Sequence, residues 1–147
     1  MSRYTRILLA VDLTDECEHV AERAVQLAQE CNCELHVIHV LEPMSIAYGG
    51  DVPTDLAAIQ GCVQEQAASQ LQEFAHSIGV PSERQHLACG RTESEIRRVA
   101  CEADADVIVV GSHGRHGLSL LLGSTANGVL NGARCDVLAV RVGSPAR

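Results

Sequence analysis

This chain of 147 residues has few aromatic residues, and it has no excess of positive charge. It contains no Trp, one Phe and two Tyr, so it offers no aromatic platform on which a single nucleic-acid strand could stack. Its formal net charge is −8 at pH 7, and general nucleic-acid binding requires a basic face. We therefore expect an aliphatic core and no nucleic-acid partner.

Long apolar runs are also missing. No run reaches the roughly 18 residues that a membrane span needs, and Met1 to Thr5 is too short and polar to begin a secretory signal. We therefore expect a cytoplasmic protein with no membrane partner. A length of 147 residues suits one domain, which we expect to span residues 1–147.

The seven cysteines lack the spacing of a zinc finger. An odd number of scattered cysteines in a cytoplasmic chain favours reduced thiols. The closest pair, Cys31 and Cys33, is spaced CxC near an expected helix end. We interpret this pair as packing residues with solvent-facing thiols.

Short apolar runs alternate with segments of helical periodicity along the whole chain. Apolar or alternating runs predict strands at residues 6–12, 34–40, 84–89, 107–110 and 136–142. Helices are predicted between them, at residues 14–32, 54–79, 92–103 and 126–133. The alternation predicts an α/β fold, a single doubly wound five-stranded parallel sheet with helices on both faces. The strand at 84–89 is the most polar and is expected at a sheet edge.

Local signals predict where several helices begin and end. Thr14 or Asp15 is expected to cap the first helix, and Thr92 with Glu95 forms a capping-box pattern. Asn32 and Gly132 are expected to end their helices, and the segment after residue 40 to Pro53 is expected to be a loop. The inner face of the helix at 54–79 is predicted from apolar residues at helical spacing, namely Ile59, Val63, Ala67, Leu71, Phe74 and Ile78.

Two histidines of the second strand, His36 and His39, are three residues apart. Successive strand residues point to opposite faces, so these two side chains cannot form one metal site. We expect a hydrogen-bonded structural role for each.

The segment from Gly111 to Thr125 is a glycine-rich loop between an apolar strand and a short helix. Gly111 and Gly114 remove side chains where a phosphate would approach the backbone. Gly123, Ser124 and Thr125 lie where the helix starts, where backbone N–H groups and hydroxyls are available as donors. Two interpretations stay open, a nucleotide phosphate site and a flexible connection with a Ser/Thr cap.

The expected fold adds a second reason to consider a ligand at this loop. In doubly wound sheets, ligands bind beyond the carboxyl ends of the strands, where the strand order reverses. Asp12 ends the first expected strand and Gly111 ends the fourth. If these strands are neighbours, the two residues meet in one crevice.

Other residues of the loop carry weaker signals. His113 and His116 lie three residues apart in the loop and could form a weak metal site with Asp12. No third ligand has motif spacing, and loop histidines beside a phosphate can hydrogen-bond it without metal, so we expect no metal site. Arg115 is the only positive charge between residues 111 and 125. It either neutralises a terminal phosphate or is solvated, and both interpretations stay open.

Four stretches together resemble the universal stress protein A family, essentially end to end. They are ILLAVDLT, LHVIHV, VIVVGSHGRHGLSLLLGSTANGVL and CDVLAVR. The resemblance implies strand order 3-2-1-4-5 and a homodimer that pairs through the last strand, from Val137 to Val140. The sequence agrees, because an apolar edge strand invites pairing.

The resemblance also implies binding of ATP or AMP, with or without Mg²⁺. The family pattern is Gly, two residues, Gly, nine residues, Gly, then Ser or Thr. Only eight residues separate Gly114 from Gly123 here, so the loop is one residue short. By the same resemblance, the ligand would be held by Asp12 at the ribose, the Val40 backbone at the adenine, Ala10 and Val11 along the adenine pocket, and Gly111, Gly114, Gly123 and Ser124 at the phosphates. Arg115, from its charge, and Thr125, from its place at the helix start, are further candidates at the phosphates.

Three classes of function remain after these observations. The first is a stress-response dimer that binds an adenine nucleotide as a regulatory ligand. The second is a nucleotide-independent dimeric interaction module with an unknown protein partner. The third is an enzyme, limited to slow ATP hydrolysis or autophosphorylation at Ser124 and Thr125, since the loop has no Walker lysine.

Overall fold

The structure, a computed structural model, describes residues 4–43, 54–112 and 123–142, without the side chains of residues 54–58 and 60. Within these residues, β1 (Arg6–Ala10), β2 (Glu34–Leu41), β3 (Gln85–Cys89), β4 (Val107–Gly111) and β5 (Asp136–Val140) form one sheet. The strand order is β3-β2-β1-β4-β5, and every neighbouring pair is parallel. The predicted fold and strand order are therefore confirmed.

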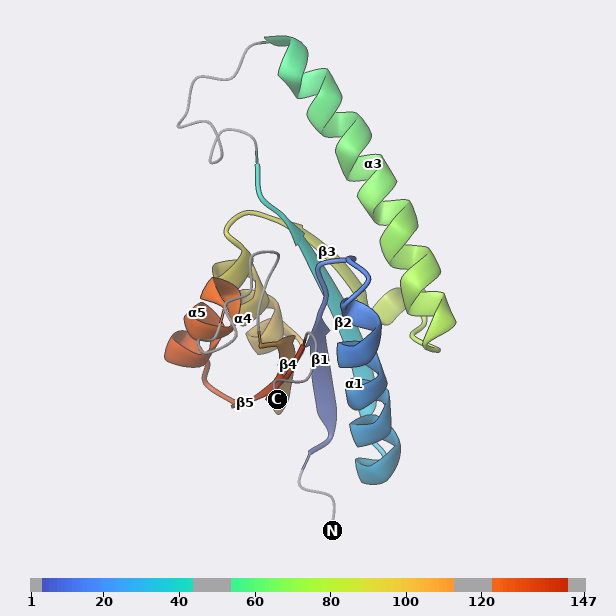
Figure 1. Ribbon diagram of the computed structural model, residues 1–147, viewed down its shortest axis with the longest axis vertical. Helices are drawn as coiled ribbons and strands as arrows, with labels where there is room; N and C mark the ends of the chain where they lie inside the picture. The colour runs from blue at the N-terminus through green and yellow to red at the C-terminus, as the bar shows by residue number, and fades with distance from the viewer. Residues whose placement is uncertain (1–3, 44–53, 113–122, 143–147) are drawn as a thin grey trace, which may run out of the picture.

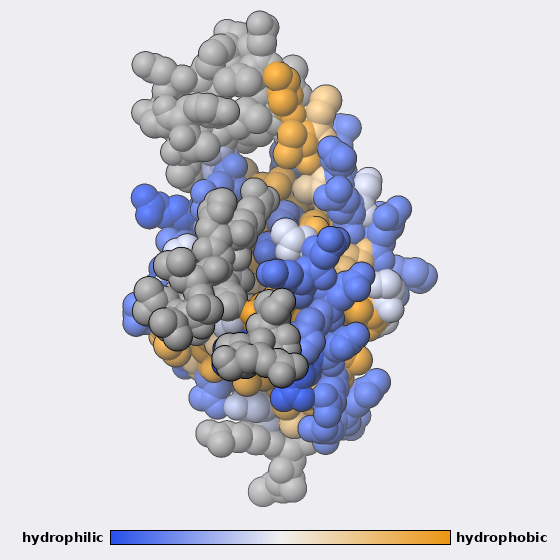
Figure 2. Space-filling model, in the orientation of Figure 1, coloured by the Kyte–Doolittle hydropathy of each residue, from blue (hydrophilic) through white to orange (hydrophobic). Residues whose placement is uncertain are grey.

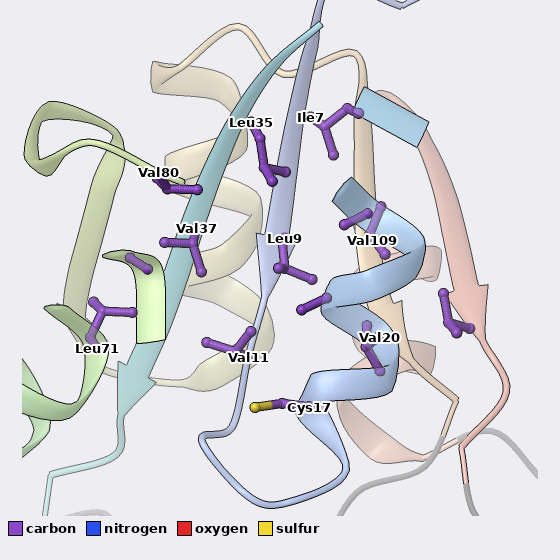
Figure 3. Close-up of a cluster of buried hydrophobic side chains, with 14 of the residues drawn as sticks. Ile7, Leu9, Val11, Cys17, Val20, Leu35, Val37, Leu71, Val80 and Val109 are labelled. Atoms are coloured by element: carbon purple, nitrogen blue, oxygen red, sulfur yellow. The ribbon is translucent and has the colours of Figure 1, made fainter. Parts of the chain in front are cut away.

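Helices cover both faces of the sheet (Figure 1). α1 (Cys17–Cys31) and α3 (Thr54–Ser77) pack on one face, and α4 (Thr92–Glu102) and α5 (Ser124–Gly132) pack on the other. Strand β1 is buried on both faces, because its consecutive residues Ile7, Leu8 and Leu9 point to alternate faces and all three are fully buried. Ile7 and Leu9 lie in the cluster with α1 and α3 (Figure 3), whereas Leu8 lies in the cluster with α4 and α5.

The two outer strands differ in character. β3, with the sequence QHLAC, is at one edge as its polar composition predicts. β5, with the sequence DVLAV, is at the other edge. The predicted edge position of the polar strand is confirmed, and an apolar strand lies at the opposite edge.

Two predicted helix caps are wrong, and a carboxylate explains each case. The N-cap of α1 is Glu16, without a side-chain cap, because the Thr14 hydroxyl donates to Asp12 instead. The N-cap of α4 is Arg91, again without a side-chain cap, and the Thr92 hydroxyl donates to Glu42 at 3.1 Å. A hydroxyl that donates to a charged carboxylate forms a stronger bond than one that accepts from a backbone amide.

The two predicted helix ends have different outcomes. Asn32 ends α1 in the left-handed conformation, with φ 55° and ψ 50°, as expected. Gly132 is instead the last residue of α5, whose C-cap is Ala133. A Cβ on Gly132 would overlap the Arg97 side chain of α4. This glycine therefore permits close packing of α5 on α4.

The predicted inner face of α3 is correct only in the second half of the helix. Ala67 and Leu71 are buried, whereas Ile59 and Val63 are 49% and 41% exposed. The first half of α3 projects beyond the sheet (Figure 1), and apolar surface is visible at that end (Figure 2). The helical pattern is present there, but among the described residues no sheet lies beneath it. The expected loop before α3 falls mostly at residues 44–53, outside the described residues.

Both histidines of β2 form hydrogen bonds, as predicted. His39 Nδ1 lies 2.8 Å from the carbonyl oxygen of Val11. His36 Nδ1 lies 3.1 Å from Nε2 of His86 on β3, and the two rings stack. Burial and the neighbouring His36 lower the pKa of His86. Both histidines of β2 therefore have the structural role that was expected.

Candidate functional site

A cavity of about 640 Å³ opens at the carboxyl ends of β1, β2 and β4. Strand β1 lies between β2 and β4 in the sheet, so the three carboxyl ends are neighbours. The strand order reverses between β1 and β4, because β2 and β3 lie on one side of β1, and β4 and β5 lie on the other. This is the switch point where doubly wound folds bind ligands. Its lining includes most of the residues predicted from the sequence, namely Ala10, Val11, Asp12, Val40, Gly111, Ser124 and Thr125.

The remaining predicted residues do not line the described cavity. Gly123 is the N-cap of α5, directly before Ser124, and its N–H donates to the carbonyl of Ser112 at 2.6 Å. Gly114 and Arg115 lie outside the described residues, as do His113 and His116. The structure thus describes the residues on either side of this segment, up to Ser112 and from Gly123.

Asp12 is held in place by its own loop. Its Oδ1 accepts from the backbone N–H of Thr14 at 3.0 Å and from the Thr14 hydroxyl at 2.7 Å. These two bonds join the Asp12 side chain to the residue two positions later, on the other side of Leu13. Leu13 has a φ of 60° and packs its side chain against the core. Oδ2 of Asp12 receives no hydrogen bond from residues 4–43, 54–112 or 123–142. A fixed carboxylate with acceptor capacity to spare therefore lines the cavity.

The N-terminus of α5 supplies donors on the other side of the cavity. The first N–H groups of any α-helix have no partner within the helix, and those of Ser124 and Thr125 belong to this first turn. No side chain caps the helix and no acidic residue lies in its first turn. The positive end of the helix dipole is therefore available to an anion in the cavity.

Ser112 joins the strand ends beside this helix. Its N–H donates to the carbonyl of Val140 at 2.7 Å, and its Oγ accepts from the N–H of Val142 at 3.1 Å. These bonds connect the residues after β4 and β5. They hold together the ends of the two strands. The glycine-rich segment begins at the end of β4, and the bond from Gly123 to Ser112 connects its other end to the same place.

Sequence reasoning missed several lining residues that are close only in the folded chain. Glu42 follows β2 and Thr92 begins α4, and their side chains meet across the cavity wall at 3.1 Å. Glu16 and Cys17, at the start of α1, also line it. These distant residues are brought together by the register between β2 and β3 and by the position of α4 after β3. No local sequence motif encodes that arrangement.

Cys17 is not a nucleophile of this cavity. The thiol is buried, and burial, followed by the charge of Asp12, raises its pKa to about 11. The reactive form of cysteine is the thiolate, which is scarce at neutral pH in this environment. Cys17 therefore contributes packing (Figure 3).

The cavity wall combines aliphatic surface with negative charge. Ile38, Val110 and Ile96 line it together with Asp12, Glu16 and Glu42, and the described part of the lining contains no arginine. Across the described ranges, no group of three His, Cys, Asp or Glu residues could hold a metal ion. Such a wall suits a flat apolar ring, whereas a polyphosphate would need a cation supplied with it or by residues 113–122.

These features define a class, a doubly wound α/β protein with a cavity at its topological switch point. Within that class, the chain belongs to the universal stress protein family, whose family model matches residues 3–141. It is 42% identical over 139 residues to universal stress protein A homolog 1 of Coxiella burnetii, covering 93% of this chain and 96% of that one.

Solved structures show the same fold. The universal stress protein UspA of Lactobacillus plantarum matches with a TM-score of 0.70 and 25% identity, over 96% of this chain and 100% of its own. A universal stress protein solved in complex with cAMP matches with a TM-score of 0.61 and 23% identity, over 94% of this chain and 97% of its own. Among the helices that the structure describes, none is long and apolar enough to cross a membrane.

Proposed function

We propose that this protein is a cytoplasmic homodimer that binds an adenine nucleotide, ATP or AMP, as a regulatory ligand. One observation carries the proposal: a single cavity joins the Asp12 carboxylate, the end of β2 at Val40 and the N-terminus of α5. These three features are an acceptor for ribose hydroxyls, a backbone edge for a base and donors for a phosphate. The universal stress protein solved with cAMP supports an adenine nucleotide as a ligand of this fold.

The cavity suggests one orientation for the nucleotide. Adenine would lie against Ala10 and Val11, with its polar edge at the Val40 backbone. The ribose would donate to Asp12, and the phosphates would accept from the first N–H groups of α5 at Ser124 and Thr125. Because His39 holds the Val11 carbonyl at 2.8 Å, the base would meet a fixed wall.

The negative lining has a consequence for the phosphates. Asp12, Glu16 and Glu42 repel a polyphosphate, so a cation must offset them. Mg²⁺ bound with ATP would supply such charge, and so would Arg115. We therefore propose that ATP binds with Mg²⁺ and that AMP, with less charge, depends less on it.

Dimerisation is proposed through β5. β5 is an edge strand of the described sheet, and its residues Val137 and Leu138 are only partly buried. On the neighbouring helix α5, Leu130 is 51% exposed. An edge strand with partly exposed apolar side chains favours pairing with a second copy.

The second candidate is a dimeric interaction module that acts without nucleotide on a protein partner. One specific observation favours it. The glycine-rich segment is one residue shorter than the family pattern, and phosphate binding needs several donors aimed at one point.

Calorimetric titration with ATP and Mg²⁺, on protein shown by native mass spectrometry to be free of nucleotide, distinguishes the two candidates. We expect saturable one-site binding that Gly114→Val abolishes, because a side chain there blocks phosphate approach. Gly61→Val is the matched control, since a Cβ at Gly61 meets nothing within 4 Å. Absence of binding to the wild type, or unchanged binding to Gly114→Val, would favour the nucleotide-independent module.

Light scattering coupled to size-exclusion chromatography tests the dimer. Ala139 on β5 is exposed, so Ala139→Glu changes the edge without disturbing the core. The new carboxylate would lie on the edge strand of both copies, where pairing would desolvate it, and we expect a monomer. A dimer that persists in this variant would place the interface elsewhere.

A further inference from the structure

Two cysteines lie one residue apart at the end of the sheet opposite the cavity. Cys31 is the last residue of α1, and Cys33 directly precedes β2. The neighbouring Cys31 thiol is one cause of the raised pKa of Cys33, and both side chains are partly exposed. This pair is a vicinal dithiol within reach of small molecules in solution, and it belongs to neither the cavity nor the β5 edge.

The residue between them determines how far apart they are. The Cα···Cα distance across one residue depends on the backbone dihedrals of that residue, and Asn32 has φ 55° and ψ 50°. The left-handed conformation mirrors the right-handed helix, whose geometry places Cα atoms two residues apart at about 5.4 Å. An extended residue would separate them by about 6.7 Å, at the upper limit for a disulfide, whose usual Cα···Cα distance is about 5.5–6 Å.

Asn32 is firmly held in this conformation. Its N–H donates to the carbonyls of Ala28 and Gln29 at the end of α1, and the N–H of Cys33 also donates to Ala28, at 2.9 Å. Asn is among the few residues other than glycine that adopt this region readily. The turn therefore places the two Cα atoms at a separation within the range found in disulfides.

We propose that Cys31 and Cys33 form a reversible disulfide when the protein meets hydrogen peroxide, which makes this turn an oxidant-sensitive modification site. The Cys31 thiolate attacks one peroxide oxygen, the O–O bond breaks, and the sulfenic acid of Cys31 and one water form. The Cys33 thiolate then attacks the sulfenic sulfur, the S–S bond forms, and the oxygen leaves as a second water. Two thiols lose two electrons and two protons, and one peroxide is reduced to two waters.

The surroundings of the two cysteines indicate which thiol reacts with peroxide and which one resolves the sulfenic acid. The Cys33 thiol donates to the carbonyl of Tyr4 at 3.0 Å, and burial together with the adjacent Cys31 raises the pKa of Cys33. A thiol with a raised pKa is rarely ionised, so Cys33 is the slower of the two to meet peroxide. Once Cys31 is oxidised, Cys33 is already adjacent to it and resolves the sulfenic acid.

Digestion at glutamate gives a direct test. Glu30 and Glu34 flank the pair, so a glutamate-specific protease releases residues 31–34 as a tetrapeptide holding both thiols. The full-length protein is treated with hydrogen peroxide, its free thiols are alkylated, and the digest is analysed by mass spectrometry. We expect a tetrapeptide two hydrogen masses lighter than the reduced form and without alkyl groups, restored to the reduced form by dithiothreitol. A doubly alkylated tetrapeptide, a sulfinic acid on either residue, or a bond to another cysteine overturns the proposal.

Two variants of Asn32 test the geometry. Asn32→Gly keeps the left-handed conformation accessible and is expected to form the disulfide at the wild-type rate. Asn32→Val disfavours that conformation and is expected to slow formation about tenfold, since β-branched residues rarely adopt it. Equal rates in the two variants, both folded by circular dichroism, would show that Asn32 does not hold the thiols together. The exposed Cys62 on α3 serves as the internal measure of peroxide exposure in each sample.

Discussion

Two aspartates lie at opposite ends of neighbouring strands, and the fold uses them differently. Asp106 directly precedes β4, and its Oδ2 accepts three hydrogen bonds. The donors are the Thr5 N–H at 2.6 Å, the Thr5 hydroxyl at 2.6 Å and the Arg6 N–H at 2.9 Å. These bonds, led by that of the Thr5 hydroxyl, lower the pKa of Asp106. Asp106 therefore ties the start of β1 to the start of β4.

Asp12 follows β1 at the other end of the sheet and is far less occupied. Thr14 is its one recorded hydrogen-bond partner among the described residues, and both bonds reach Oδ1. Asp12 is exposed and lines the cavity. The comparison shows that the amino end of the sheet uses its carboxylate within the fold. The carboxyl end keeps acceptor capacity that a ligand can use.

The largest expected effect concerns ligand affinity at Asp12. Asp12→Asn keeps an oxygen that can accept from Thr14 but loses the charge and the second acceptor oxygen. With Mg²⁺ present to offset the repulsion between Asp12 and the phosphates, loss of the ribose hydrogen bonds dominates. We expect ATP affinity, measured by calorimetry with Mg²⁺, to fall by about tenfold to a hundredfold, the range for hydrogen bonds to a charged group. The urea midpoint should stay within error of the wild type. Unchanged affinity would remove Asp12 from the proposed site.

The second effect concerns stability at Asp106. Asp106→Ala leaves the Thr5 and Arg6 N–H groups without their acceptor. We expect a free energy of unfolding lower by about 2 kcal/mol, a figure reduced for solvent exposure. ATP affinity should remain within about twofold of the wild type, because Asp106 lies at the end of the sheet away from the cavity.

A neighbouring carboxylate controls the Asp106 experiment. Asp104 has an 83% exposed side chain, and its recorded ion-pair contact is with Arg6 at 3.9 Å. Exposed pairs of this kind contribute about 0–1 kcal/mol. Asp104 has a φ of 53°, a region that Asn adopts as readily as Asp, so Asp104→Asn should change stability little. If Asp106→Ala folded normally but lost ATP binding, the contrast between the two ends of the sheet would be wrong.

The pH dependence of stability sharpens the same comparison. The pKa of Asp106 is lower in the folded protein than the ordinary 3.8, so the folded state favours the charged form. Its contribution is fully present above pH 3.8 and is lost as the pH falls through the folded pKa. We expect the stability difference between the wild type and Asp106→Asn, from urea titrations, to shrink as the pH falls below 3.8. A constant difference down to pH 2.5 would show that the charge of Asp106 contributes nothing.

The contrast also shows which parts of the site a sequence can predict. Asp12 and Gly111 were predictable because apolar runs end at them and parallel strands end at a common edge. Glu42 and Thr92 were not, because their contact depends on the register of β2 and β3 and on the position of α4. A local pattern gives the end of a strand, but not what faces it across a crevice.

The helices likewise show which parts of the fold a sequence pattern can predict. The spacing of Ile59 and Val63 predicts the correct helix and the face that carries apolar residues. It carries no information on whether a sheet lies beneath that face, and both side chains are exposed. Likewise, Thr14 has the residue type of a helix cap, but whether it caps depends on Asp12, whose carboxylate receives the hydroxyl instead.

The smallest expected effects come from the threonine beside each aspartate. Thr14→Val removes the hydroxyl that holds Asp12 Oδ1 at 2.7 Å but keeps the backbone donor. With one of two restraints gone, the carboxylate is less preorganised, and we expect ATP affinity to fall about two- to fivefold, equivalent to one ordinary hydrogen bond. Thr5→Val is the matched change at the other end, where the hydroxyl donates to Asp106 at 2.6 Å. It should lower stability by about 1 kcal/mol and leave ATP affinity unchanged. If Thr14→Val instead lowered only stability, Asp12 would belong to the framework of the fold, as Asp106 does.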